Sequence, residues 1–161
     1  MPEAENRYHH QDTDARFLSL HDCSAEQVSY EQETLSVYFP DGFWLLENHP
    51  ENPTGEVVKT DAAKVAFSVL DEGTDGVTVY TFGKTKRGRS VRKEWPLADF
   101  MKTVNNGTYR VEFVGQYEGY QSRLYTCYVY FDKRPWCREC QIWIHTDKVT
   151  FCWNQIREEP A

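Results

Sequence analysis

The sequence has no apolar run long enough for a membrane-spanning helix and no secretion signal. Such a helix needs roughly 20 consecutive apolar residues, and no stretch of the 161 residues approaches that length. Residues 1–16 are polar and acidic, without the basic start and apolar centre of a signal peptide. The five cysteines are odd in number and scattered, unlike a disulfide framework. We therefore expect a cytoplasmic protein with reduced thiols and no membrane contact.

Positive charge is scarce in the first half of the chain. Residues 1–75 contain 4 Lys or Arg against 16 Asp or Glu, whereas residues 76–161 contain 14 against 9. With a net charge of −7, nucleic acid is not an expected partner. The asymmetry predicts a charge-polarised molecule that orients a partner before contact. The acidic half suits a protein partner with a basic surface, and self-association through the basic half of a second copy is an alternative.

Helical periodicity is confined to one segment. Four apolar residues recur at helical spacing after Pro96 and predict one helix near residues 97–106: Leu97, Phe100, Met101 and Val104. Elsewhere apolar and polar residues alternate, which indicates strands. The aromatic-rich residues 109–153 read as three strands of an antiparallel meander, with turns at Glu118–Gly119 and Asp132–Pro135.

Two shorter hairpins are expected earlier in the chain. One joins Leu35–Phe39 to Phe43–Leu46, and the other joins Val77–Phe82 to Val91–Trp95. The fold class is therefore mainly β, with α+β as the alternative, and a strongly curved sheet, a sandwich or a partly open barrel all fit. We expect residues 1–16 to form a mobile tail, residues 17–156 to form a single domain and residues 157–161 to fray.

Cysteine chemistry is the first candidate function. Cys137 and Cys140 have the spacing of a zinc-binding pair, and His145 and Cys152 could complete four ligands. The second C-x-x-C of a zinc site is missing, and residues three apart on a regular strand point to opposite faces. Cys140 as a buried apolar residue is the simpler interpretation, so no cofactor is expected. His21, Asp22 and Cys23 offer a base, a carboxylate and a thiol, but neighbours along a strand face apart.

Basic and aromatic residues supply the candidate binding sites. Residues 84–93 contain six Lys or Arg and no acidic residue, and Lys86, Arg87 and Arg89 fall at the expected hairpin tip. Such a tip can bind phosphate or an acidic surface, although lysines there also deter edge-to-edge pairing of strands. Among the aromatic residues, most of which should be core, four are the candidates for exposure together: Tyr117, Tyr120, Trp136 and Trp143.

The segments Leu20–Cys23 and Leu35–Phe43 resemble the opening of small bacterial β-rich proteins. Proteins of this size and acidity resemble immunity proteins, which neutralise the toxins of neighbouring cells. The leading hypothesis is therefore a non-enzymatic protein-binding module of the immunity or inhibitor type that occupies a basic surface. A carrier with an aromatic-lined pocket for a small ligand is the first alternative, and a zinc- or cysteine-dependent enzyme is the second.

Overall fold

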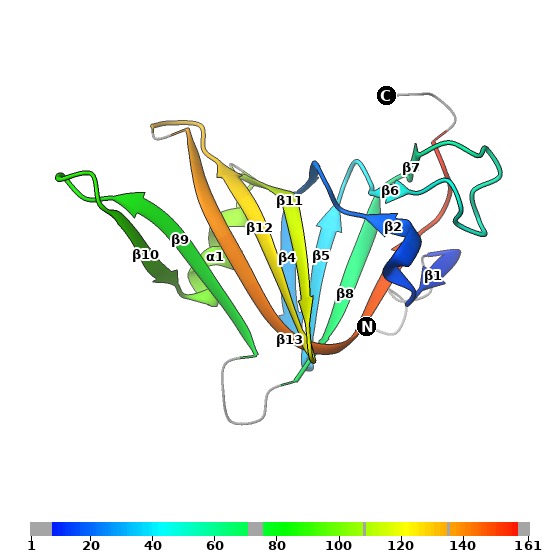
Figure 1. Cartoon of the computed structure of the whole chain (residues 1–161), viewed down its shortest axis with the longest axis horizontal. Helices are drawn as coiled ribbons and strands as arrows, with labels where there is room; N and C mark the ends of the chain where they lie inside the picture. The colour runs from blue at the N-terminus through cyan, green and yellow to red at the C-terminus, as the bar shows by residue number, and fades with distance from the viewer. Residues whose placement is uncertain (1–7, 71–75, 108, 135, 158–161) are drawn as a thin grey trace.

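The computed structural model describes residues 8–70, 76–107, 109–134 and 136–157, and strands dominate it (Figure 1). The first half contains eight strands and a short 3₁₀ turn: β1 (His10–Asp12), η2 (Ala15–Phe17), β2 (Leu18–Ser19), β3 (Cys23–Ala25), β4 (Gln27–Glu31), β5 (Thr34–Phe39), β6 (Trp44–Leu45), β7 (Val58–Lys59) and β8 (Ala63–Val69). The second half contains β9 (Val77–Lys84), β10 (Ser90–Trp95), α1 (Leu97–Asn105), β11 (Arg110–Gly119), β12 (Ser122–Tyr130) and β13 (Cys137–Trp153). The mainly β fold, the helix and the C-terminal meander are thus as predicted.

The strand β13 organises the main sheet because it pairs with four others. Its first half lies between β12 and β9, and its second half lies between β8 and β1. The pairing with β8 shifts register between Thr146 and Lys148, which is where the strand bends. Figure 1 shows β13 turning there from one limb, with β9 to β12, into a second limb, with β4, β5 and β8.

The main sheet folds over on itself. Its ten antiparallel strands include the path β3-β11-β12-β13-β8-β5-β4, yet the two end strands are consecutive in the chain and separated only by Glu26. The sheet curves strongly in this way but does not close into a barrel. Aromatic rings join the two limbs across the interior, since Phe113 packs edge-on against Phe39, and Tyr125 against Phe67.

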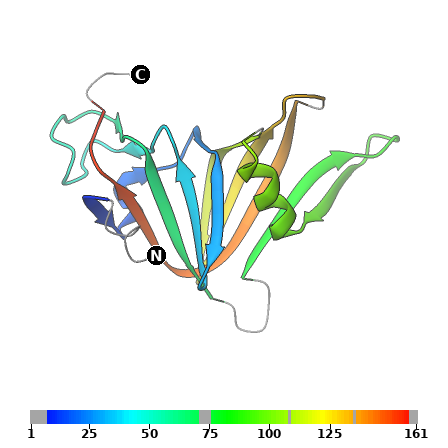
Figure 2. The ribbon, with the colours of Figure 1, turned by 180° about the vertical axis from the view of Figure 1, so that it is seen from behind.

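The helix α1 fills the space between β4 and β9, as seen from behind in Figure 2. Its apolar side chains Phe100 and Val104 are buried in the core. Its last residue, Asn105, uses its side-chain amide to pair with the backbone of Val28 on β4. The Val28 N–H donates to Oδ1 and the Asn105 Nδ2 donates to the Val28 carbonyl, each at 2.7 Å. The side chain thus replaces a neighbouring strand along part of the β4 edge.

The hairpin predicted between Leu35–Phe39 and Phe43–Leu46 is wrong. The turn after β5 forms as expected, with the Gly42 N–H bonded to the Phe39 carbonyl at 3.0 Å. Gly42 has a φ of +76°, however, and lies so close to the Thr60 carbonyl that a Cβ would clash. The chain leaves the main sheet here, and β6 pairs with β2 and β7 in a separate three-stranded sheet. The strand β5 instead lies between β4 and β8.

Residues 8–16, expected as part of a mobile tail, belong to the fold. The strand β1 pairs with the end of β13, with His10 opposite Trp153. The His10 ring stacks on the Trp153 indole at 5.2 Å between centroids. The polar composition of residues 8–16 did not indicate this order, because a few specific contacts hold the segment in place and it buries little apolar surface. Residues 1–7 and 158–161 lie outside the described residues.

Side chains fill the interior of the curved sheet. The void between the limbs and α1 has a volume of only about 10 Å³, and its lining is wholly apolar. That volume holds at most one water molecule. This void is therefore too small for the small ligand of the carrier hypothesis. In the described part of the chain, no helix is both long and apolar enough to cross a membrane.

Candidate functional site

The structure does not bring the four candidate zinc ligands together. Cys137 and Cys140 lie on the regular strand β13, and Cys137 is exposed while Cys140 is fully buried. Cys152 is near the other end of the same strand, and His145 points outward. Within the described ranges, no group of three His, Cys, Asp or Glu side chains could hold a metal ion. Burial raises the pKa of the Cys140 thiol to about 12, which suits packing and not metal ligation.

The His21, Asp22 and Cys23 side chains do not form a catalytic arrangement either. Cys23 is buried, and desolvation raises the pKa of its thiol to about 11. His21 is exposed, with Nδ1 hydrogen-bonded to the Val114 carbonyl at 2.8 Å and Nε2 at 3.4 Å from an Asp22 carboxylate oxygen. The base and carboxylate face solvent because they lie in the turn before β3, where Asp22 has a φ of +61°, while the thiol on β3 faces the core.

The four aromatic candidates are all exposed, but they do not form one cluster. The exposed fractions are 61% for Tyr117, 90% for Tyr120, 56% for Trp136 and 39% for Trp143. Tyr117 and Trp143 both lie opposite Leu124 in the register of β11, β12 and β13, so they form one row on the outer face of the sheet. Tyr120 and Trp136 lie in the turns at opposite ends of β12.

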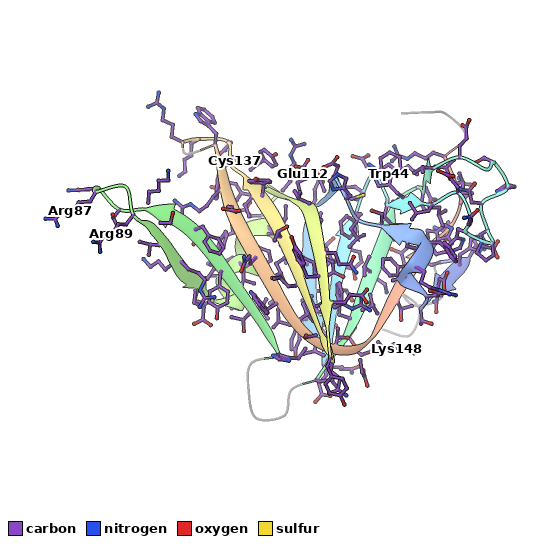
Figure 3. All side chains as sticks on the ribbon, viewed as in Figure 1. Trp44, Arg87, Arg89, Glu112, Cys137 and Lys148 are labelled. Carbon is purple, nitrogen blue, oxygen red and sulfur yellow. The ribbon has the colours of Figure 1, made fainter. Side chains whose placement is uncertain are left out.

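The predicted hairpin forms from β9 and β10. It projects from the body of the protein (Figure 1), and its tip is strongly basic. The turn is closed by the Thr85 N–H bonded to the Arg89 carbonyl at 2.9 Å. Figure 3 shows Arg87 and Arg89 extending from the tip. Residues 83–94 are all exposed, and in the described part of the chain no carboxylate pairs with Lys84, Lys86, Arg87, Arg89 or Lys93. We call residues 84–93 the basic hairpin.

An open hollow lies between the basic hairpin and the turn that connects β12 to β13. Its volume is about 280 Å³ and its lining combines cations with aromatic rings: Thr81, Lys93, Glu94, Trp95, Phe131 and Arg138. The two rings are held from behind, since Trp95 packs edge-on against Phe100 and Phe131 against Tyr109. The rings are therefore rigid walls, whereas the Lys93 and Arg138 side chains are free to reach a ligand.

The opposite end of the molecule carries an ordered acidic loop. Residues 40–62 contain Asp41, Glu47, Glu51, Glu56 and Asp61 against a single lysine. Asp41 is bonded to Arg157, and Asp61 accepts the backbone N–H groups of residues 154 and 155. The three glutamates are exposed. We call residues 46–57 the acidic loop.

Two buried polar residues hold the acidic loop in place. The Asn52 amide donates to the carbonyls of Leu46 and Glu56 at 3.0 and 2.7 Å, and its oxygen accepts from the Thr54 N–H at 3.0 Å. The His49 Nδ1 accepts the Glu51 N–H at 3.0 Å, so its Nε2 carries the proton that is donated to Asp12 at 2.8 Å. Both ring nitrogens are occupied, so His49 is a structural residue and cannot act as a general base.

Sequence reasoning missed Asn52, His49 and Asn105. Each has an ordinary local context, in a loop or at a helix end. The partners of Asn52 lie in its own loop, whereas those of His49 and Asn105 include groups far away in the chain. For Asn52 a weak signal exists, because Asn in a short segment with two prolines often bonds to its own loop backbone. For His49 and Asn105 the partners are 37 and 77 residues away in the chain, and nothing local indicates them.

Comparison with protein-family models, with curated proteins and with solved structures finds no match to this chain. The fold and the site define a class only: a curved antiparallel β protein with one capping helix and charged elements of opposite sign at its two ends.

Proposed function

We propose that the protein is a non-catalytic, protein-binding module that recognises its partner by charge. The observation that carries this is the separation of charge along the long axis, with the basic hairpin at one end and the acidic loop at the other (Figure 1). Oppositely charged ends create a dipole that orients an approaching protein and speeds encounter.

The partner of the acidic loop is a protein with a basic surface. Glu47, Glu51 and Glu56 are exposed, and the hydrogen bonds of Asn52 and His49 fix the loop before binding. A preordered loop loses little conformational entropy when it binds, which favours affinity. This suits a bacterial immunity or inhibitor protein that covers the basic surface of a toxin or enzyme, acting in the cytoplasm where its thiols stay reduced.

Affinity capture from a lysate of the source organism tests this proposal. We expect the wild-type chain to retain a protein at low salt, and the variant Glu47→Gln/Glu51→Gln/Glu56→Gln to lose it. The matched control Glu94→Gln/Asp99→Asn/Glu139→Gln removes the same charge elsewhere and should retain it. Capture of no protein, or equal capture by all three chains, contradicts the proposal.

A further inference from the structure

The strands β9 and β13 separate part of the way along their length and leave a wedge between them. They pair from Val77 opposite Ile144 as far as Thr81 opposite Cys140. Beyond that point β9 continues to Lys84 paired only with β10, and β13 extends back to Cys137 paired only with β12. Figures 1 and 2 both show the two hairpins diverging from there. Phe82–Lys84 and Cys137–Glu139 therefore present two strand edges that face the wedge.

The direction of each backbone group follows from neighbouring hydrogen bonds. In an antiparallel strand, alternate residues point their N–H and C=O to the same side. The Gly76 carbonyl accepts the His145 N–H, and the Thr85 N–H is directed to the carbonyl of Arg89, which immediately precedes β10. Phe82 and Lys84 therefore point toward β13, and Cys137 and Glu139 point toward β9. Among the described residues Lys84 and Cys137 have no backbone partner on that side. The Phe82 carbonyl and the Glu139 N–H are also free there, because the pairing of Thr81 with Cys140 uses only the Phe82 N–H and the Glu139 carbonyl.

Side chains around the wedge determine what it accepts. The inner side is the hollow of about 280 Å³ with Trp95 and Phe131 as apolar walls and Lys93 and Arg138 as cations. In Figure 3, the labelled Arg87 and Arg89 flank one side of the opening and Cys137 marks the other. Lys93 and Arg138 outnumber the single carboxylate of Glu94 in this lining, and the tip of the basic hairpin adds further cations. The strand edges therefore repel basic segments and attract acidic ones.

We propose that this wedge binds an extended acidic segment of a partner protein by strand addition. The backbone of the segment continues the ladder at the edges of β9 and β13. Its inward side chains enter the hollow between Trp95 and Phe131, where carboxylates meet Lys93 and Arg138. Strand edges offer alternating donors and acceptors that match a peptide and not a phosphate backbone, so a peptide is favoured over nucleic acid. This site is separate from the acidic loop of the proposed function.

The test uses defined probes and the full chain. The first probe is a fluorescent peptide that alternates glutamate and valine, and the second is the same peptide with alternate backbone amides N-methylated, which keeps the charge and removes donors. A single-stranded oligonucleotide is the third probe. The double variant Lys93→Glu/Arg138→Glu is compared with Lys148→Glu, a control on the far half of β13 (Figure 3), and far-UV circular dichroism verifies that each variant folds.

We expect the acidic peptide to bind, with affinity unchanged by Lys148→Glu. The affinity should fall at least about tenfold on N-methylation, which removes backbone hydrogen bonds, and in the double variant, which removes charge-assisted hydrogen bonds. Binding should also slow amide exchange at Lys84, Cys137 and Glu139. The proposal is overturned if the peptide does not bind, if the N-methylated peptide binds equally well, or if the oligonucleotide binds more tightly. The wild-type comparison of the two peptides remains decisive even if a variant fails to fold.

Discussion

At the scale of single residues, polar side chains with distant partners hold the structure together. Asn105 completes the edge of β4, Asn52 and His49 order the acidic loop, and Asp12 accepts the proton of His49. The bonds of Asn105 and of His49 with Asp12 join segments that are far apart in the sequence, whereas those of Asn52 close its own loop. Their loss should affect stability far more than the loss of neighbouring exposed residues.

Asn105→Ala should lower the free energy of unfolding by about 1–3 kcal/mol, because the N–H and C=O of the buried Val28 lose their partners. Urea unfolding followed by tryptophan fluorescence measures this. Lys102→Ala, at an exposed position of the same helix, is the control and should change stability by less than about 0.5 kcal/mol. Equal values for the two variants would show that the amide does not support the strand edge.

Tyr125→Phe should leave stability unchanged or raise it by about 1 kcal/mol. The Tyr125 hydroxyl is buried and meets no hydrogen-bond partner among the described residues, so removing it relieves a desolvation penalty. The same burial raises the pKa of the phenol well above its usual value. Thermal unfolding by calorimetry is the measurement, and a clear loss of stability would show that the hydroxyl is in fact bonded.

Cys137 should react with a thiol reagent in the native protein, whereas Cys23, Cys127 and Cys140 should react only after unfolding. Partial desolvation and the nearby Glu112 carboxylate raise the pKa of the Cys137 thiol. The thiolate is therefore a small fraction at neutral pH, and the labelling rate should rise with pH through the alkaline range. Glu112→Gln removes the repulsion and should speed labelling at pH 7. Slower labelling of this variant would contradict the assignment.

At the scale of elements, one long strand connects two structural regions. The first half of β13 contributes Trp143 to the outer row with Tyr117 and forms one edge of the wedge. The second half pairs with β1 and β8 beside the core. Because β13 bends near Thr146, both halves of the strand line the same core. The strand β1 has only three residues and cannot form a stable strand without the contacts of Trp153 and His49.

Asp12→Ala should destabilise the protein by about 1–3 kcal/mol, because the buried Nε2–H of His49 loses its acceptor. It should also release the acidic loop, seen as faster amide exchange at residues 46–57. Glu47→Ala, which removes an exposed carboxylate from that loop, should change stability by less than about 0.5 kcal/mol. Unchanged exchange in Asp12→Ala would show that Asn52 alone orders the loop.

At the scale of the whole molecule, charge is distributed along the long axis. Such a dipole can attract a second copy, with the acidic loop of one against the basic hairpin of the other. We expect weak self-association at low ionic strength that salt near 1 M suppresses, because screening then acts within about 3 Å. Sedimentation velocity measures it, with Lys86→Ser/Arg87→Ser/Arg89→Ser as the variant that should stay monomeric. Association that does not depend on salt would indicate that the copies meet through the outer row of Tyr117 and Trp143 instead.

Local pattern and turn chemistry were sufficient to predict the mainly β class, the single helix, the C-terminal meander and the basic hairpin, because period-two alternation and tight turns are encoded by adjacent residues. The exposure of Tyr117, Tyr120, Trp136 and Trp143 could also be anticipated, although not which of them share a face. The hairpin assigned to Phe43–Leu46 failed because the direction of the chain after Gly42 depends on Thr60, which approaches it only in the folded structure.

Only the tertiary structure decided where the charged segments lie, where β9 parts from β13, and that residues 8–16 belong to the fold. These features depend on contacts between residues far apart in the chain, such as His49 with Asp12 and Asn105 with Val28. Whether the edge of a strand is free likewise depends on which strands pair with each other in the folded protein. No local pattern of residues encodes it, because the same alternation describes a strand with one neighbour or with two.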